Sequence, residues 1–385
     1  MAPPRMPEAV IGLDVGKLSH WACVATRDGE ILLSAPVANR EGDLDSLFGR
    51  FPDALVVVDQ SRNIGALALA RAKAAGMSAA YLPGLAAHGA ARLFAGDAKT
   101  DERDAMVIAK TALGIPDALL PVGDPGPTVA AARALAAQRN FLTCENTRSK
   151  NRLRSILLES CPAFEALVDL SDGPQLRLMA SLGGAWSVAD AGPRRAAALT
   201  RGAVRGKIEA LVHSTASSTR PDAAAIAAED RAVRLLARRI SENSAEIDVI
   251  TAEISALLEG DDTYRCLLTV PGIGPKTASE LAISIDIEDF PSHDRLASYC
   301  GLAPRNRQSG TSISSVTASR QGNKRLKNLL IFSCNCLTRT EGRWGDYYAR
   351  CRERGMPHGK ALKALARKRL KVIYAIMRDR VPYAA

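Results

Sequence analysis

Four aspartates stand where a divalent-metal site would need them. Asp14 and Asp59 each end an apolar run that is typical of a buried strand. Asp101 and Asp104 lie three residues apart at a predicted helix start. Carboxylates at two strand ends that face an i, i+3 pair on a helix can hold Mg²⁺, because this hard cation prefers oxygen ligands. Paired metals at such a site can activate a nucleophile and stabilise a leaving oxygen in phosphoryl transfer.

Each of these aspartates alone also has a simpler explanation. A strand-end carboxylate such as Asp14 can be merely solvated, and Asp101 can be an acid that the helix dipole favours at a helix N-terminus. The combination favours a metal site, because two apolar β runs both end in Asp. Lys17 and Lys99 stand nearby in the sequence and could either contact a scissile phosphate or remain solvated.

Residues 8–115 alternate strand and helix patterns in the order βββαβαβα. Strands are predicted at residues 10–13, 20–26, 31–37, 55–59 and 78–82, and the first two helices at 44–48 and 64–75. This order predicts an α/β domain of the RNase H-like class. Such a domain places Asp14 in the middle of the sheet, Asp59 on the neighbouring strand and the Asp101 helix over that edge.

The remainder of the chain is predicted to be mainly α-helical. Its expected parts are a proline-rich linker at 116–127, a coiled-coil arm at 128–260 with a helical insert at 163–225, and a C-terminal domain at 261–385.

Two long helices are expected to form the arm. One spans residues 128–160, and the other spans residues 230–258 and repeats apolar residues at a 3–4 spacing. The repeat comprises Ala232, Leu235, Leu236, Ile240, Ile247, Ile250, Ile254 and Leu258. This seam could fold back on the first helix or pair between subunits.

Residues 270–278 read VPGIGPKTA and precede an apolar helix. Gly272, Gly274 and Lys276 fit a helix–hairpin–helix, in which a Gly-rich turn presents backbone N–H groups to a nucleic-acid phosphate. The structural alternative is a tight turn that needs Gly for a positive φ. The pattern favours nucleic-acid binding without recognition of base sequence.

Ser309 lies in a run of Ser, Thr and Gly with basic residues on both sides. The basic residues are Arg305, Arg307, Arg320, Lys324 and Arg325. Guanidinium groups could neutralise a phosphodiester and lower the cost of ionising the serine hydroxyl. Residue chemistry alone favours an ordinary Ser/Thr loop that positions phosphate, because the stretch holds many serines and no histidine base.

Composition indicates a folded protein with a polyanionic partner. The 385 residues are 47% hydrophobic, which is enough for two or three domains with separate cores. The net charge is +10, and residues 305–380 hold nineteen Lys/Arg against four acids. Aromatic residues make up 4%, which argues against a stacking platform for single strands.

Several classes of protein and site are not expected. The eight cysteines form no CxxC pair, so we predict no zinc site and a cytoplasmic protein with reduced thiols. No stretch reaches the roughly 18 apolar residues of a membrane span. The five histidines show no ligand spacing, and each, His20 included, is expected at the surface or at a helix cap.

The motifs, taken in order, resemble a known family. They are GLDVGK, VVVDQS, AKTDERDA, PGIGPKTA, YCGLAP and QSGTS. Together they resemble the DEDD transposases of bacterial insertion sequences, described as bridge-RNA-guided recombinases, over about residues 8–383. The pair KTDxxDA and GLAP-x(4)-SG is specific, whereas PGIG alone is not.

The resemblance implies a RuvC-like N-terminal domain, a coiled-coil arm and a C-terminal transposase domain. Ser309 would attack DNA and form a covalent phosphoserine link, while Asp14, Asp59, Asp101 and Asp104 would bind Mg²⁺. One departure is that the second acidic position is typically Glu followed by Ala-Thr-Gly, whereas here Asp59 precedes Gln-Ser-Arg.

The resemblance also implies several partners. They are double-stranded donor and target DNA, a structured guide (bridge) RNA, and further copies of the chain in a dimer to tetramer. The expected location is the cytoplasm, with association with the nucleoid when the protein is active. Two alternatives stay open: a RuvC-like Holliday-junction nuclease that uses metal-activated water, and a non-catalytic nucleic-acid-binding protein.

Overall fold

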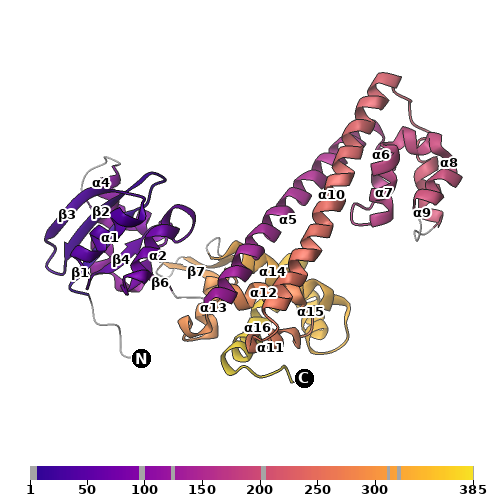
Figure 1. Ribbon diagram of the computed structural model, residues 1–385. Coiled ribbons are helices and arrows are strands. Elements are labelled where there is room, and N and C mark those ends of the chain that lie inside the picture. Colours follow the sequence, from indigo (N-terminus) through magenta and orange to yellow (C-terminus); the bar gives the residue numbers. More distant parts are fainter. Residues whose placement is uncertain are drawn as a thin grey trace. The chain divides into compact units, whose positions relative to one another are not determined.

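The chain forms two compact units, at residues 1–124 and 125–385 (Figure 1). The computed structural model describes residues 7–94, 100–122, 126–200, 205–309, 313–318 and 322–384, with the backbone alone at 121, 205, 305–309 and 313–318.

A mixed β-sheet organises the first unit. Its strands are β1 (Ala9–Asp14), β2 (Ser19–Thr26), β3 (Ile31–Ala38), β4 (Leu55–Val58), β5 (Ala79–Tyr81) and β6 (Leu120–Pro121). They lie in the order β3-β2-β1-β4-β5-β6. β1 pairs antiparallel with β2 and parallel with β4, so the β1–β3 meander leads into a parallel crossover. This order of strands is compatible with an RNase H-like domain.

Helices cover both faces of this sheet. They are α1 (Glu41–Arg50), η1 (Asn63–Gly65), α2 (Ala66–Ala74), α3 (Gly84–Ala91), α4 (Asp101–Gly114) and η2 (Pro116–Ala118). α1 and α2 pack on the face that carries Ile11 and Leu13, whereas α4 packs on the opposite face with Val10 and Val57. Strand residues alternate between the faces, so the apolar run of β1 is buried on both sides.

The predicted order of strands and helices is confirmed in this unit, with additions. α3 was not expected, and residues 116–127, whose prolines predict a linker, include η2 and β6. β6 pairs with β5 and is the edge strand, where Pro121 is tolerated because no ladder partner is needed on the outer side.

Two 35-residue helices form the arm of the second unit, α5 (Gly126–Ser160) and α10 (Ala223–Leu257). They run side by side within one chain, and Asn146 Nδ2 donates to Ser244 Oγ at 3.0 Å between them (Figure 1). The predicted seam is partly wrong, because Leu235 is 64% exposed whereas Val233 and Ala237 are buried. Ile240, Ile250, Ile254 and Leu258 of the predicted seam are buried as expected, and only its first part differs, where Val233 and Ala237 are the buried residues.

Four shorter helices connect the arm helices at one end: α6 (Pro162–Leu167), α7 (Gly173–Leu182), α8 (Ala185–Leu199) and α9 (Arg205–His213). They share a core with the adjacent ends of α5 and α10. Asp230 of α10 anchors them by accepting from Gly184 N at 2.8 Å and from Ser187 Oγ at 2.5 Å. The weak sequence pattern at 163–225 therefore corresponds to a folded helical subdomain.

The other end of the arm merges with the C-terminal helices. These are α11 (Asp262–Leu268), α12 (Pro275–Ser284), η3 (Ile287–Asp289), α13 (His293–Tyr299), α14 (Lys324–Asn335), η4 (Cys336–Arg339), α15 (Arg343–Glu353) and α16 (His358–Asp379), with a hairpin of β7 (Pro304–Ser309) and β8 (Ile313–Ala318). One core joins Ala132 and Ile254 of the arm to Leu365 and Ile373 of α16. The arm base and the C-terminal helices are therefore one packed body.

Candidate functional site

Two of the four predicted acids end neighbouring parallel strands. Leu13 of β1 is paired with Val58 of β4, so Asp14 and Asp59 follow paired positions at the carboxyl ends of both strands. Val10 and Val57 face α4, and alternation along a strand puts Asp14 and Asp59 on that same face. The sheet therefore brings both carboxylates to one edge, beneath α4.

Helix α4 brings the other two acids to this face. Thr100 caps its N-terminus by accepting from Arg103 N at 3.2 Å, which places Asp101 and Asp104 in the first turn. The helix can approach β1 closely because Gly12 has no side chain. A Cβ at Gly12 would lie 2.6 Å from both the carbonyl oxygen of Ala105 and the amide nitrogen of Ala109.

Burial leaves the carboxylate of Asp59 poorly solvated. Burial raises its pKa, and the charge of Asp104 raises it further, while the Val15 N–H donates to Asp59 Oδ1 at 3.4 Å and opposes the shift. Asp101 is exposed, and Lys99 lies outside the described residues. Asp59 and Asp104 therefore repel each other across the sheet edge, and a cation between them would relieve that repulsion.

The carboxylates fit an open site for Mg²⁺ better than a closed cage. In the part of the chain that the structure describes, which includes all four aspartates, no three His, Cys, Asp or Glu side chains are grouped to hold a metal. Mg²⁺ commonly binds through one or two carboxylates and completes its shell with waters and substrate phosphates. Asp14, Asp59 and Asp104 could supply the protein side of such a site, with Asp101 one turn away.

His20 clamps the turn that follows Asp14, and its expected surface position was wrong. The imidazole is 1% exposed, accepts from Gly16 N at 3.2 Å and contacts Asn39 Oδ1 at 3.1 Å. Asn39 Nδ2 in turn donates to the carbonyl of Lys17 at 3.2 Å. Desolvation lowers the pKa of His20, which favours the neutral ring that can accept this hydrogen bond. The clamp fixes the turn beside Asp59.

Replacing Gly12 is expected to disrupt the acidic edge without altering any acid. A Gly12→Ala side chain would meet backbone atoms, so α4 must move away, at a cost of about 1–3 kcal/mol for overpacking. Thermal unfolding should show this loss, and any Mg²⁺-induced rise in melting temperature should shrink with it. Gly49→Ala is the matched control, because its Cβ would meet nothing within 4 Å. Equal behaviour of the two variants would contradict this role for Gly12.

Ser309 lies at the end of β7 in a two-stranded hairpin that the sequence analysis did not predict. Its backbone pairs with Ile313 of β8, and Arg305 and Arg307 occupy alternate positions of the same strand. Arg320 lies outside the described residues, and Lys324 opens α14 as an exposed side chain. The backbone therefore places Ser309 at the last position of a β-strand instead of in a loop.

The Gly-rich motif forms the predicted turn between two helices, α11 and α12. Gly272 has a φ of +77°, and a Cβ there would lie 2.7 Å from the carbonyl oxygen of Ser333. Gly274 caps α12, whose first turn carries the exposed Lys276. Buried Arg369 of α16 secures the turn, donating to the carbonyls of Pro271 at 2.5 Å and Ser333 at 3.1 Å.

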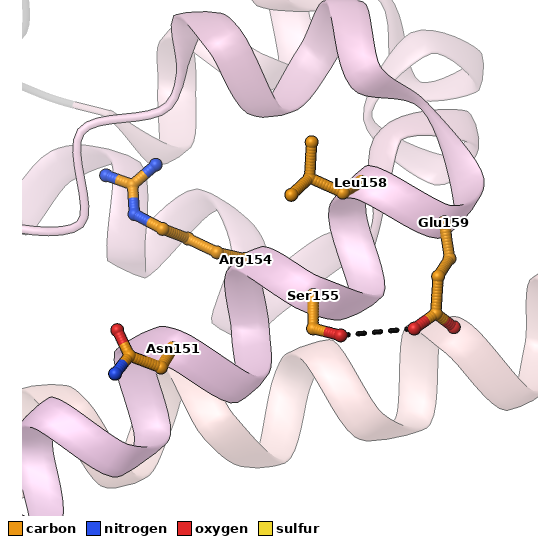
Figure 2. A pocket seen from close by; sticks show the side chains of 5 residues that line it. All are labelled: Asn151, Arg154, Ser155, Leu158 and Glu159. Atoms are coloured by element: carbon orange, nitrogen blue, oxygen red, sulfur yellow. Dashed lines mark hydrogen bonds between the residues drawn. The ribbon is translucent and has the colours of Figure 1, made fainter.

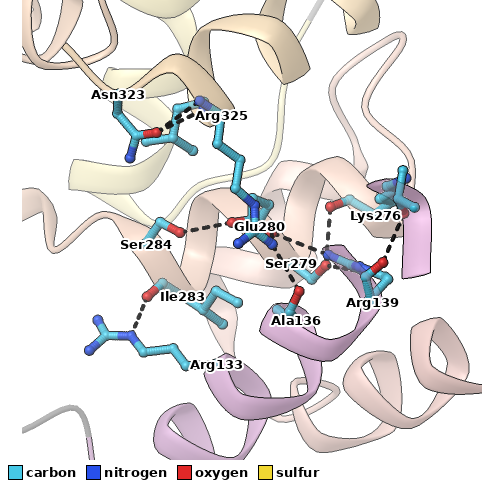
Figure 3. A network of polar contacts seen from close by, with 12 residues as sticks. Arg133, Ala136, Arg139, Lys276, Ser279, Glu280, Ile283, Ser284, Asn323 and Arg325 are labelled. Atoms are coloured by element: carbon cyan, nitrogen blue, oxygen red, sulfur yellow. Dashed lines mark hydrogen bonds and ion pairs between the residues drawn. The ribbon is translucent and has the colours of Figure 1, made fainter. Parts of the chain in front are cut away.

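A buried ionic network joins this turn to the arm (Figure 3). Glu280 of α12 accepts from Arg139 at 3.3 Å and from Arg325 at 2.5 Å, and Arg325 also donates to the carbonyl of Ala136 at 3.0 Å. Burial lowers the pKa of Arg139, and Arg325 lowers it further, whereas Glu280 opposes the shift. The network ties α5, α12 and α14 together and positions Arg325, which the sequence analysis assigned to nucleic-acid contact.

Removing the shared charge is expected to destabilise the second unit. Glu280→Gln keeps the shape but leaves two guanidinium groups close together, one of them 1% exposed. Breaking such a buried pair costs about 3–5 kcal/mol. Urea unfolding should show this loss, while the exposed Glu259→Gln stays within about 0.5 kcal/mol of the wild type. A loss no greater than that control would show that Glu280 contributes no net stability.

Two of the hollows on this unit are lined by residues of α5. The larger, of about 710 Å³, lies between the Gly-rich turn, α5 and α14 and includes Lys276 and Phe332 in its lining. Figure 2 shows the other, about 380 Å³, lined by Asn151, Arg154, Ser155, Leu158 and Glu159 of α5. There Ser155 donates to Glu159 at 3.1 Å and Arg154 pairs with Glu165, contacts that stabilise the arm itself.

Within the described residues, no helix has the length and apolar character needed to cross a membrane.

Comparison with known proteins places the chain in a family. Residues 11–162 match a DEDD-type family profile described as a transposase, and residues 264–349 match one described as the transposase IS116/IS110/IS902 family. Both profiles cover regions that hold the sites described above.

Full-length relatives support the same placement. The chain is 34% identical over 383 residues to the insertion element IS110 43.6 kDa protein of Streptomyces coelicolor, covering 96% of this chain and 94% of the relative. It is 32% identical over 382 residues to the IS116 44.8 kDa protein of Streptomyces clavuligerus, with the same coverage of 96% and 94%. A pilin gene-inverting protein of Moraxella bovis is 37% identical over 127 residues, 30% of this chain and 37% of the relative. The chain therefore belongs to the IS110/IS116 transposase family of insertion sequences, a family of DNA-processing enzymes.

Proposed function

We propose that this protein cuts and rejoins DNA strands of its insertion sequence through a covalent phosphoserine intermediate on Ser309. The observation that carries this proposal is the family relationship over 96% of the chain, which holds both the acidic quartet and the serine motif. A serine nucleophile conserves the energy of the phosphodiester, so the cut strand can be rejoined without another energy source.

The proposed step is a transesterification. The Ser309 oxygen bonds to phosphorus, a deoxyribose oxygen leaves with the proton that the serine loses, and the serine phosphodiester remains. A strand hydroxyl then attacks the same phosphorus and restores the serine hydroxyl. Arg305 and Arg307 would neutralise the phosphate during both displacements.

The N-terminal unit would act as an RNase H-like, RuvC-like domain. Asp14, Asp59, Asp101 and Asp104 would hold Mg²⁺, which when bound supplies positive charge to the phosphate oxygens. The open arrangement of these carboxylates, with repulsion between Asp59 and Asp104, supports this assignment. Lys99 would contact the phosphate backbone nearby.

The partners follow from the same proposal. The Gly272–Gly274 turn with Lys276, and the basic residues Arg320, Lys324 and Arg325, would bind the DNA backbone. A structured guide RNA encoded by the element would select the donor and target DNA by base pairing, which leaves the protein to contact backbone and shape. Two to four copies would assemble on the paired DNA sites.

Rejoining distinguishes this proposal from the RuvC-like nuclease. The Moraxella relative is named a pilin gene-inverting protein, and inversion of a DNA segment requires that cut strands be rejoined. That relationship favours a recombinase over an enzyme that only hydrolyses DNA.

The covalent intermediate is the direct test. RNA that copurifies with the protein would be sequenced, and DNA sites complementary to it would be incubated with the complex and Mg²⁺ before denaturation. We expect a protein–DNA adduct whose phosphate maps to Ser309 by mass spectrometry. DNA cut with ¹⁸O from labelled water in the new phosphate ends, and no adduct, would instead establish the hydrolytic nuclease. Full activity after RNase digestion would contradict the guide RNA.

A further inference from the structure

The larger hollow combines a phosphate-binding turn with an exposed aromatic ring. Its lining includes Gly272, Gly274 and Lys276 from the turn and the start of α12, and Asn328, Phe332 and Asn335 from α14. The three α14 positions are spaced by four and three residues, so they share one face of the helix. Phe332 is 73% exposed although it lies within this concave surface.

The charge of the hollow suits a polyanion. Arg139, Lys276 and Arg325 face a single carboxylate, Glu280, so cations outnumber acids in the lining (Figure 3). Although the Lys276 side chain is partly exposed, desolvation by the surrounding protein lowers its pKa, and repulsion from Arg139 and Arg325 lowers it further. Arg139 and Arg325 both form salt bridges with Glu280, whereas Lys276 lies in the first turn of α12. A bound phosphate would offset this repulsion.

The ring adds a feature that phosphate binding does not need. In a duplex the bases stack on each other and leave no free face for Phe332 to contact. An unpaired base can leave the stack and place its face against an aromatic ring. Asparagine amides can donate to and accept from base edges. Asn328 and Asn335 are exposed, line the hollow, and lie four residues before and three residues after Phe332 in the sequence.

We propose that this hollow, which we call the α12–α14 groove, binds an unpaired nucleotide of the DNA substrate, with its base stacked on Phe332 and its 5′ or 3′ phosphate at Lys276 and the Gly-rich turn. The proposal rests on the proposed function for the choice of DNA. The groove volume of about 710 Å³ lies within the range of about 300–1,000 Å³ that is usual for small-ligand sites. A single ring here is compatible with the low aromatic content, because one base needs one platform.

Binding of defined oligonucleotides to the full-length protein tests the groove. The probes are a fully paired DNA duplex, the same duplex with one central unpaired 2-aminopurine, and an RNA duplex with the same bulge. Phe332→Ala should weaken binding of the bulged DNA by about 5- to 150-fold, the measured range for loss of one base stack. Binding of the paired duplex should change by less than about twofold, because positioning by phosphate contacts persists. Quenching of 2-aminopurine in the wild type should be lost in Phe332→Ala and restored in Phe332→Trp.

Two further variants complete the test. Phe141→Ala removes another exposed phenylalanine, 54% exposed on α5 and outside the groove lining, and should leave all three affinities unchanged. Lys276→Gln should weaken the paired and the bulged DNA alike. Equal loss of paired and bulged DNA in Phe332→Ala, no loss in either, or a loss confined to the RNA probe would overturn the proposal. If the Ser309 adduct still forms while Phe332→Ala binds normally, the groove assignment fails and the proposed function stands.

Discussion

Ser309→Ala is expected to abolish covalent capture of DNA and to lower the rate of strand joining on the order of 10⁴-fold or more, as loss of an enzyme nucleophile does. The variant removes only the side-chain oxygen of Ser309. The pairing of Ser309 with Ile313 is made by the backbone and does not need that oxygen. DNA affinity and thermal stability should therefore stay close to those of the wild type. Strand exchange on paired DNA sites, followed by denaturing gels, measures the rate.

The control for Ser309→Ala lies in the same hairpin. Ser314→Ala removes an equivalent hydroxyl from β8, where Ser314 pairs with Gln308. We expect this variant to join strands within about threefold of the wild-type rate, as is usual for a substitution outside the chemistry. Comparable activity of Ser309→Ala and the wild type would exclude Ser309 as the nucleophile and leave metal-activated water as the attacking group.

Asp59→Asn is expected to have opposite effects on activity and on stability. As a member of the proposed metal site, it should lose Mg²⁺-dependent strand cleavage by about 10²-fold or more, the scale of a lost electrostatic contribution to the transition state. In metal-free buffer the variant should be more stable than the wild type, because the carboxylate is desolvated and repelled by Asp104. Addition of Mg²⁺ should stabilise the wild type more than the variant.

The pH dependence gives an independent measurement of the same effect. The folded state raises the pKa of Asp59, so the folded protein holds this proton to a higher pH than the unfolded chain does. Metal-free stability should therefore fall as the pH rises from the ordinary aspartate pKa through the raised value, and then level off. Asp59→Asn should remove this fall, as urea unfolding between about pH 4 and 8 would record.

Asp53→Asn is the matched control for Asp59→Asn. Asp53 is an exposed residue in the turn before β4, so its replacement removes one carboxylate near the same strand without touching the acidic edge. It should change neither Mg²⁺-dependent cleavage nor the stability profile. A loss of stability in metal-free Asp59→Asn would show that the hydrogen bond from Val15 outweighs the repulsion from Asp104.

The amino-acid sequence by itself determined the order of elements in the first unit and the two helices of the arm. Their patterns are local: apolar runs that end at Asp14 and Asp59, and long stretches without Gly or Pro. The Gly-rich turn was predictable for the same reason, because a positive φ at Gly272 is a property of a few neighbouring residues. The Ser309 motif was recognisable in the sequence, but the hairpin that carries it was not, because residues 304–309 and 313–318 show no regular alternation of apolar and polar types.

The tertiary structure alone decided which distant residues hold these elements in place. Gly12 is needed because the backbone of α4 crosses β1 at that point. A glycine within an apolar strand indicates that some backbone approaches closely, but the sequence does not say which one. Arg139 and Glu280 lie 141 residues apart, and buried Arg369 reaches the turn at Pro271 from 98 residues away. Charged residues of this kind look solvated in a sequence, because hydropathy carries no information about a partner that folding supplies. The acids and the serine are the sequence's prediction of the chemistry, and packing determines whether the groups around them are buried and paired.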